Sequence, residues 1–295
     1  MPSPCSLGRS EASVPSGQVP RPQRTLTRVA RVALASLTTV LCSFTSAVDA
    51  QTTMEVTLAG RSVAVDVYRP DVPLRGAAIL SHGFTRSRTT LGGHAAALAA
   101  AGIVALTPDM PTTFDFNHNA QGLAELVGML RAGGKFGAPV ERVVLVGFSA
   151  GGLSSLLAAA TPGVVGYIGL DPFDRVSRDG GSALGLDFAP TLRTEAVLLR
   201  APPSRCNAQA VAAPWGKALP TLLSDRVIDG ASHCDFESPT DWMCRLACGD
   251  THPARQSIVR AGLMEAMDRW LPREQAADPA VGERLRTGSP RSDNR

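Results

Sequence analysis

The feature that most constrains the fold is a Gly-x-Ser-x-Gly turn between an apolar run and a run of small residues. Residues 141–152 read ERVVLVGFSAGG, with the pattern of a strand at 142–146 and of a helix from 152 to 160. Such a tight turn needs glycines because side chains there would collide with the neighbouring strand or helix, and it strains its serine. The serine hydroxyl then lies at a helix N-terminus, which favours negative charge. We therefore expect Ser149 to be a nucleophile, in preference to a structural glycine-rich turn.

The elements around this turn predict an α/β-hydrolase fold, with a mainly parallel sheet of about eight strands flanked by helices and no large lid domain. Strands are expected at 53–58, 62–68, 77–81, 103–106, 142–146, 164–170, 196–199 and 221–227, and helices at 91–101, 121–131, 152–160 and 257–271. The first two strands alternate in polarity, which is typical of an antiparallel edge. Residues 172–194 read as a long loop that could hold a helical turn. They are too few for a large lid domain, so a fairly open cleft is expected.

The chain divides into three predicted parts: a signal peptide at 1–50, an α/β-hydrolase domain at 51–272 and a disordered tail at 273–295. In the first part, a positively charged stretch precedes the apolar run 32–47, and Val48-Asp49-Ala50 fits a cleavage site before Gln51. The apolar run has about 16 residues, fewer than the roughly 20 that span a bilayer. We expect a periplasmic or secreted protein whose mature chain does not insert stably into membranes.

The charge balance argues against nucleic acid as a partner. The chain has 29 basic and 26 acidic side chains, and residues 1–50 hold five arginines but only Glu11 and Asp49, so 24 of each sign remain after export. Neutralising phosphates needs clustered Lys and Arg. The segment 133–137, GGKFG, resembles a phosphate loop only superficially, because Phe136 follows Lys135 and no strand directly precedes it. The sequence gives no indication of oligomeric state.

Four cysteines remain after removal of residues 1–50, an even number in a chain bound for an oxidising compartment: Cys206, Cys234, Cys244 and Cys248. We expect two disulfides, since the spacings match no standard zinc pattern. Four cysteines allow three pairings and the sequence does not decide between them. Of these, we favour Cys206 with Cys234.

The catalytic base is expected after the last strand, because the chain order in this fold is Ser, acid, His. His233 fits, with His252 as the alternative. His82 follows the strand 77–81 and is expected to pack beneath its loop and fix it, not to act as the base. The remaining two histidines are expected to be structural: His94 and His118.

The acid is found partly by elimination. Residues 196–224, where many proteins of this fold carry it, contain no Asp or Glu. Asp171 ends the preceding strand, where its carboxylate could reach His233 and hold its tautomer. Pro172 favours an extended geometry at Asp171. Asp174 and Asp187 are the fallback candidates.

An oxyanion hole needs the amide after the nucleophile and a second amide from the loop after an earlier strand. These are expected to be Ala150 and Phe84, with Gly83 allowing the backbone to approach the substrate. Trp215 and Trp242 are expected near the catalytic rim, where they could line an acyl pocket or equally form a satellite core.

These motifs resemble the chlorophyllase-type branch of the α/β-hydrolases, with similarity to secreted bacterial esterases and, more distantly, to cutinase-like polyester hydrolases. The resemblance covers most of residues 53–272. The family pattern is matched by the Gly-x-Ser-x-Gly-Gly elbow at 147–152, by Gly-x-Asp-Pro at 169–172, and by His-x-Asp at 233–235 followed by Cys244 and Cys248. The resemblance implies that the catalytic triad consists of Ser149, Asp171 and His233.

The residues and the resemblance together predict a serine hydrolase that cleaves a small-molecule or lipid-like carboxylic ester through an acyl-enzyme, without a cofactor or metal. Thioester or lactone cleavage, or acyl transfer, by the same triad is an open alternative, as is a non-catalytic hydrolase-like binding protein. Phe148 and Ala150 stand where plant chlorophyllases tend to carry His and Arg. An exported protein would also not meet chlorophyll in its usual compartment, so the resemblance is taken to imply ester chemistry without the pigment.

Overall fold

The computed structural model describes residues 51–176 and 182–273. The predicted signal peptide at 1–50 and all but the first residue of the predicted tail at 273–295 lie outside the described residues. None of the helices in the described part of the chain is long and apolar enough to cross a membrane.

Eight strands form one sheet in the order β1-β2-β4-β3-β5-β6-β7-β8. Their bounds are β1 Gln51–Leu58, β2 Arg61–Tyr68, β3 Gly76–Ser81, β4 Ile103–Pro108, β5 Val143–Phe148, β6 Val164–Leu170, β7 Ala196–Arg200 and β8 Leu222–Val227. Strand β2 is antiparallel to both of its neighbours, and the strands from β4 to β8 run parallel. The predicted, mainly parallel sheet with an antiparallel edge is confirmed.

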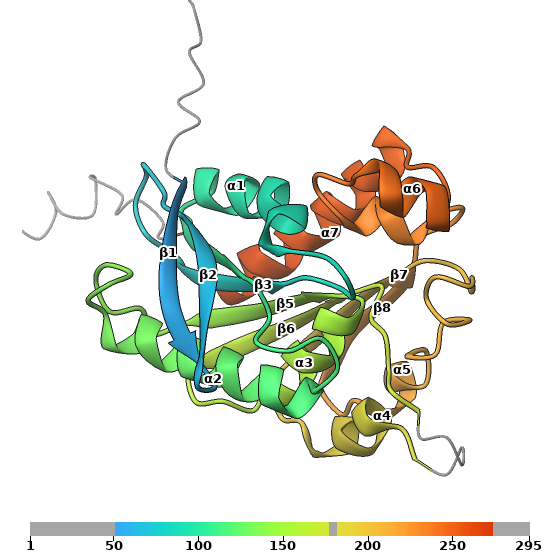
Figure 1. Ribbon diagram of the computed structural model, residues 1–295, viewed down its shortest axis with the longest axis horizontal. Coiled ribbons are helices and arrows are strands. Elements are labelled where there is room, and N and C mark those ends of the chain that lie inside the picture. Colours follow the sequence, from blue (N-terminus) through green and yellow to red (C-terminus); the bar gives the residue numbers. More distant parts are fainter. Residues whose placement is uncertain (1–50, 177–181, 274–295) are drawn as a thin grey trace, which may run out of the picture. The chain divides into compact units, whose positions relative to one another are not determined.

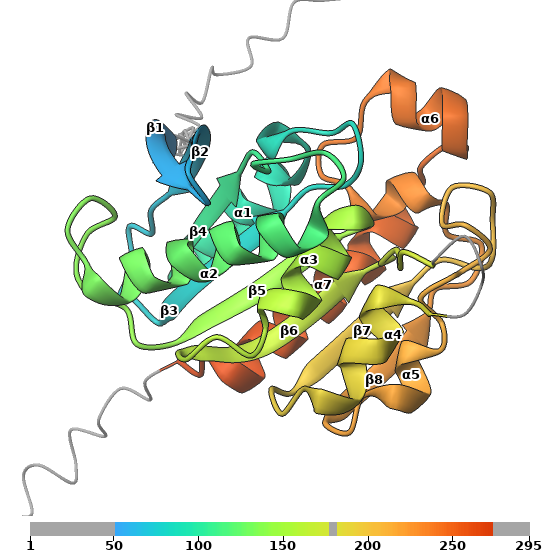
Figure 2. The same ribbon diagram turned by 60° about the horizontal axis from the view of Figure 1, so that its bottom comes forward.

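Helices cover both faces of the sheet (Figure 1, Figure 2). On one face, α1 (Gly92–Ala100) and α7 (Pro253–Trp270) share a core with β3, β5 and β6. On the other face lie α2 (Phe116–Ala132) and α3 (Ala150–Ala158), followed by the short helices α4 (Leu184–Phe188) and α5 (Trp215–Ala218). Because β3 and β5 are buried along their whole lengths, their sequences are continuous apolar runs without alternation.

Side-chain caps explain where the structure differs from the predicted helix bounds. The helix predicted at 121–131 begins earlier, at Phe116, because the Asp115 carboxylate accepts a hydrogen bond from the His118 amide at 3.0 Å. The helix predicted from 257 begins at Pro253, since His252 Nδ1 accepts from the Ala254 amide at 3.2 Å.

The sequence prediction missed the short helices α5 and α6. The helix α6, Trp242–Cys248, is too short for a periodic pattern, and it begins where the Asp241 carboxylate accepts from the Cys244 amide at 2.9 Å. The predicted loop 172–194 contains α4, whose Gly185 and Leu186 amides donate to the Asp174 carboxylate at 2.7 and 2.9 Å. In its described residues this connection contains α4, a 3₁₀ turn and an isolated bridge between Val176 and Ala183.

Candidate active site

The turn between β5 and α3 has the geometry of the predicted elbow. Ser149 has φ +53° and ψ −120°, a region that residues with a side chain rarely adopt, and it is the N-cap of α3. A Cβ at Gly147 would lie 2.3 Å from the Gly151 carbonyl oxygen, and one at Gly151 would lie 2.2 Å from that of Ser81. Glycine is therefore required at both flanking positions, and the strained serine is held by the packing of two strands and a helix.

His233 and Asp171 form a direct, buried contact. The Asp171 Oδ2 atom lies 2.6 Å from His233 Nδ1, and the side chains are 2% and 8% exposed. Because a carboxylate only accepts hydrogen bonds, Nδ1 carries the proton, and Nε2 is left with a free lone pair. The Phe148 ring packs on the imidazole with ring centroids 4.6 Å apart. The imidazole thus has a fixed tautomer and orientation.

The turn that carries His233 is tied to the body of the protein by Asp235. This buried carboxylate accepts hydrogen bonds from the Ser232 amide at 2.8 Å, from the His252 amide at 2.7 Å and from the Arg255 guanidinium at 2.6 Å. The last two donors flank the start of α7. The aspartate of the His-x-Asp motif therefore holds the histidine loop against α7.

Asp171 is held on its other side by a residue that the sequence prediction missed. Asn207 is fully buried, and its Nδ2 lies 3.3 Å from both carboxylate oxygens of Asp171. The Ala201 amide donates to Asp171 Oδ1 at 2.9 Å. Asp171 itself has φ +40°, so the extended geometry that was expected before Pro172 is wrong. With donors on both oxygens, the carboxylate has one available orientation.

Asn207 also organises its own loop. Its Oδ1 accepts from the Ser204 and Ala210 amides at 2.8 and 2.9 Å, and its Nδ2 donates to the Pro202 carbonyl at 3.0 Å. The three residues after it all have positive φ, from 49° to 59°, although none is glycine. Such left-handed residues each cost about 1 kcal/mol or more, so this loop depends on the asparagine and on the disulfide at Cys206 to keep its shape.

The fallback candidates for acid and base lie elsewhere. Asp174 caps α4 and accepts from the Trp215 indole Nε1 at 2.7 Å, and Asp187 is exposed on α4. His252 is an exposed cap of α7. Trp215 is buried in the core beside α4, which fits the satellite-core alternative, and Trp242 is 65% exposed on α6. Neither Trp215 nor Trp242 lines the cavity that contains Ser149.

The other buried histidines have structural contacts. His82 Nε2 accepts from the Met110 amide at 3.1 Å and its Nδ1 lies 2.8 Å from the Gly83 carbonyl oxygen, so the ring fixes the loop as predicted. Burial lowers the pKa of His82. His94 Nε2 lies 3.1 Å from the Phe236 carbonyl oxygen, which joins α1 to the turn of His233. Burial lowers the pKa of His94 to about 4.

The two predicted oxyanion donors flank the nucleophile. Phe84 follows β3, and Ala150 is the first residue of α3. A Cβ on Gly83 would lie 3.0 Å from Ser149 Cβ, so glycine lets the loop pass close to the serine without a tight contact. Within the described part of the chain, neither amide donates a hydrogen bond to another residue. Both are free to bind a substrate oxygen.

Ser149 and His233 line the same cavity, which has a volume of about 470 Å³ and is called the large cavity below. Three phenylalanine rings, a methionine and cysteines of both disulfides form part of its wall: Phe84, Phe148, Phe173, Met243, Cys206, Cys244 and Cys248. The volume lies within the range of small-molecule sites. An apolar ligand group of moderate size would fit beside the serine and histidine.

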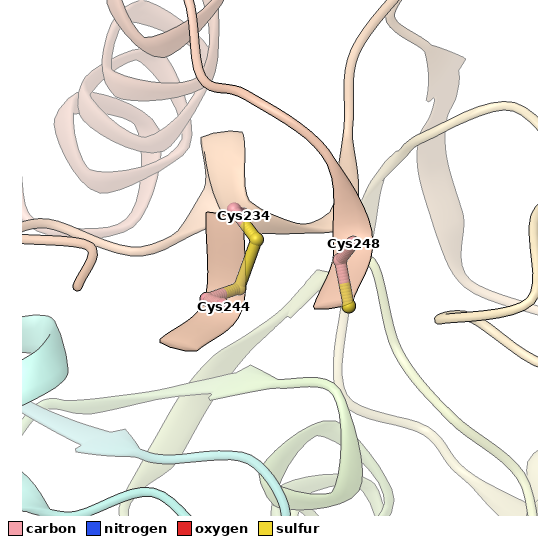
Figure 3. A group of neighbouring side chains, drawn as sticks. All are labelled: Cys234, Cys244 and Cys248. Atoms are coloured by element: carbon pink, nitrogen blue, oxygen red, sulfur yellow. A yellow bond between two sulfur atoms is a disulfide. The ribbon is translucent and has the colours of Figure 1, made fainter. Parts of the chain in front are cut away.

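The two expected disulfides are present, but the favoured pairing of Cys206 with Cys234 is wrong. Cys206 is bonded to Cys248. Cys234 is bonded to Cys244, and Cys248 lies beside this disulfide (Figure 3). Both bonds end on α6, because the loop around Asn207 packs onto this helix and the chain after His233 turns directly into it. The sulfurs of Cys234, Cys244 and Cys248 lie within 4.8 Å of one another. As disulfides they offer no thiolate to a metal.

A buried ion pair joins the oxyanion loop to the histidine loop. Arg86 Nε donates to Glu237 Oε1 at 2.6 Å and its NH2 to Oε2 at 2.9 Å, and the side chains are 9% and 0% exposed. Asp241 adds a second contact at 3.0 Å. Burial raises the pKa of Glu237, and the hydrogen bonds from Arg86 oppose that shift. The two loops that flank Ser149 are therefore held at a fixed separation.

Comparison with known proteins defines the fold of the chain. No protein-family model matches the sequence, and no curated protein matches it. Among solved structures, the chain is similar to dienelactone hydrolase from Anabaena variabilis ATCC 29413, with a TM-score of 0.58 and 20% sequence identity. The alignment covers 75% of this chain and 98% of that one. The protein has the α/β-hydrolase fold, as the element order and the sheet topology had indicated.

Proposed function

We propose that this protein is a serine hydrolase of carboxylic esters, with Ser149 as nucleophile, His233 as base and Asp171 as the acid that orients it. One observation carries the proposal: the strained Ser149 lines a cavity together with a histidine whose tautomer is set by a buried carboxylate at 2.6 Å. A strained serine needs support from its surroundings, and such strain is concentrated at functional sites.

In the proposed mechanism His233 Nε2 takes the proton of Ser149 Oγ as this oxygen bonds to the ester carbonyl carbon. The Phe84 and Ala150 amides bind the resulting oxyanion. The bond to the alcohol oxygen then breaks, and His233 gives its proton to the departing alcohol. Water, deprotonated by the same histidine, hydrolyses the acyl-enzyme and restores the serine. Asp171 stabilises the imidazolium in both halves.

The test combines probe labelling with turnover. Purified protein is treated with a fluorophosphonate, and the modified peptide is identified by mass spectrometry; hydrolysis of p-nitrophenyl butyrate is measured in parallel. Label on Ser149, lost together with turnover in a folded Ser149→Ala variant, is expected. A Ser149→Ala variant that still hydrolyses the ester would reject the assignment, and a protein that neither reacts nor turns over substrate would fit the non-catalytic binding alternative.

Lactone cleavage by the same residues is a second candidate, which the name of the similar solved structure, a dienelactone hydrolase, favours. A lactone is a cyclic ester, so its carbonyl would meet the same nucleophile and amides. Thioester cleavage and acyl transfer would also use this arrangement. A panel of linear esters, lactones and thioesters, compared by kcat/KM, separates these activities.

We also propose that the protein is exported to the periplasm or secreted. The two disulfides in the described residues support this, because such bonds persist in oxidising compartments. Placement in the chlorophyllase-type branch likewise remains a proposal. It is supported by the positions of Asp171 after β6 and of His233 after β8.

A further inference from the structure

The wall of the large cavity carries a charged side chain that has no counter-ion. Besides His233, the ionisable residues of this wall are Arg86, Arg205 and Glu237. The charges of Arg86 and Glu237 are taken up by their mutual ion pair, and Asp241 contacts Arg86 as well. Within the described part of the chain, the Arg205 side chain makes no hydrogen bond or ion pair. Its guanidinium, which stays protonated, therefore keeps its donors available for a ligand.

The backbone that carries Arg205 is fixed relative to the proposed triad. Arg205 directly precedes Cys206, whose disulfide ties the loop to α6. The Ser204 amide, on the other side of Arg205, donates to Asn207 Oδ1 at 2.8 Å. Because Asn207 also contacts the Asp171 carboxylate, one asparagine supports both the triad acid and the turn that contains Arg205.

The Arg205 side chain is accessible from the same space as the reacting groups. Arg205 is exposed, and it lines the large cavity together with Ser149 and His233. A ligand that fills this cavity can therefore contact the serine, the histidine and the guanidinium at once. Most of the other wall residues are apolar, so they offer an anionic group of that ligand no competing cation.

We propose that the preferred substrate carries a carboxylate in addition to its scissile ester, and that Arg205 binds this carboxylate. The proposal rests on the proposed esterase function and specifies its substrate class. A guanidinium suits this role because its parallel N–H donors match the two oxygens of a carboxylate. The cavity volume of about 470 Å³ lies in the range of small-molecule sites, so it can hold a ligand with both groups. Arg205 is then a specificity-determining residue that takes no part in bond breaking.

Two pairs of rigid esters test the preference, with the charge on either side of the scissile bond. 4-Acetoxybenzoate and 4-acetoxybenzamide differ in the alcohol arm, whereas methyl 4-carboxybenzoate and methyl 4-carbamoylbenzoate differ in the acyl arm. A carboxylate and a carboxamide have nearly the same shape, so each pair differs mainly in charge. The charge preference is defined as kcat/KM of the carboxylate divided by that of the amide. We expect it to be about 5-fold in at least one pair, as for an ion pair partly screened by solvent.

Variants of Arg205 show whether this side chain causes the preference. Arg205→Gln is expected to lower the charge preference about 5-fold, and Arg205→Lys to keep most of it because the charge remains. Arg205→Glu should reverse the selectivity, so that esters with a trimethylammonium group in place of the carboxylate become better substrates than the amides. Raising NaCl to about 0.5 M should lessen the preference of the natural protein, since salt screens exposed charges.

Arg245→Gln is the matched control. Arg245 is also exposed and also lacks a side-chain partner among the described residues, but it lies on α6 outside the wall of the large cavity. Its loss removes the same charge from the same region of the protein, and the charge preference should not change.

Three results would overturn the proposal: a charge preference near one in both pairs, equal changes of it in Arg205→Gln and Arg245→Gln, or a loss in Arg205→Gln that is the same for carboxylate and amide. The last would show that Arg205 only maintains the loop. Failure of the esterase function itself would look different, because none of the four esters would be cleaved and Ser149 would not react with the fluorophosphonate. That outcome would reject both proposals.

Discussion

Asp171 and His233 are 62 positions apart in the sequence, yet Asp171 Oδ2 lies 2.6 Å from His233 Nδ1. The sheet brings them together, since Asp171 ends β6 and His233 follows β8, and parallel strands present their carboxyl ends at one edge. The contact is buried and the carboxylate has further donors on its other side, so the imidazole keeps its orientation in the absence of substrate.

Replacing Asp171 by Asn is expected to lower kcat by about 10⁴-fold with little change in KM, because the amide no longer sets the tautomer of His233. Steady-state kinetics with p-nitrophenyl butyrate measures this. Asp174→Asn is the matched control: Asp174 accepts three hydrogen bonds at α4 and Trp215, so its loss should cost about 1–3 kcal/mol of unfolding free energy and leave kcat nearly unchanged. The reverse pattern would make Asp174 the acid.

Asn207 is expected to act as a positioning residue for Asp171. Asn207→Ala removes the donor to the carboxylate and should lower kcat about 100-fold, the effect of misplacing a catalytic group by roughly 1 Å. Asn207→Asp adds a negative charge beside Asp171, which should move the acid limb of the kcat/KM profile to higher pH. An exposed residue of the same loop supplies the control, Gln209→Asn. An unshifted profile in Asn207→Asp would leave Asn207 a structural role only.

The two disulfides are expected to differ in their effects. They close loops with sequence separations of 42 and 10 residues, so the chain-entropy argument gives about 4 kcal/mol for Cys206–Cys248 and about 3 kcal/mol for Cys234–Cys244. Urea unfolding of the two double Cys→Ser variants measures these losses. Turnover should fall in both variants, because Asn207 follows Cys206 directly and His233 directly precedes Cys234. Unchanged turnover in either variant would contradict this coupling.

Stability is expected to fall in mild acid because of His94. Burial lowers the pKa of His94 from 6.5 to about 4, so the unfolded chain binds the proton more tightly than the folded one. The unfolding free energy should therefore rise as the pH increases from about 4 to 6.5, and His94 contributes about 3 kcal/mol to this change.

Urea unfolding at several pH values compares the natural protein with His94→Gln, whose amide can still donate to the Phe236 carbonyl. The stability of this variant should depend less steeply on pH over the same interval. Identical slopes would show that other groups cause the acid sensitivity. His82 offers a comparison, because burial lowers its pKa as well, and its replacement should also lessen the loss of stability below pH 6.5.

The parts of the fold that follow from local patterns could be predicted from the sequence. Buried strands such as β5 are continuous apolar runs, and the elbow at Ser149 has a motif because its glycines avoid specific collisions. Because residues 196–224 contain no Asp or Glu, the sequence favours Asp171 as the acid, and in the structure Asp171 contacts His233. Helix starts were less accurate, since they depend on single caps such as Asp115.

The rest depends on where irregular loops meet in space. Asn207 lies in a loop without periodicity, and only the folded chain shows that its amide reaches Asp171. The cysteine pairing was missed for the same reason, because α6, on which both bonds end, leaves no hydrophobic repeat in the sequence. The contact of Arg86 with Glu237 joins residues 151 positions apart, a separation at which no sequence pattern points to a partner.

The ion pair of Arg86 and Glu237 limits how this cleft can be redesigned. A protein engineer who exchanges the segment 84–87 for one from another hydrolase, without an arginine at position 86, would leave Glu237 as a buried charge with no counter-ion. Such an uncompensated charge costs about 3–5 kcal/mol, much of what keeps an ordinary domain folded. The segment that contains Arg86 and the segment that contains Glu237 should therefore be exchanged together, so that the ion pair is kept.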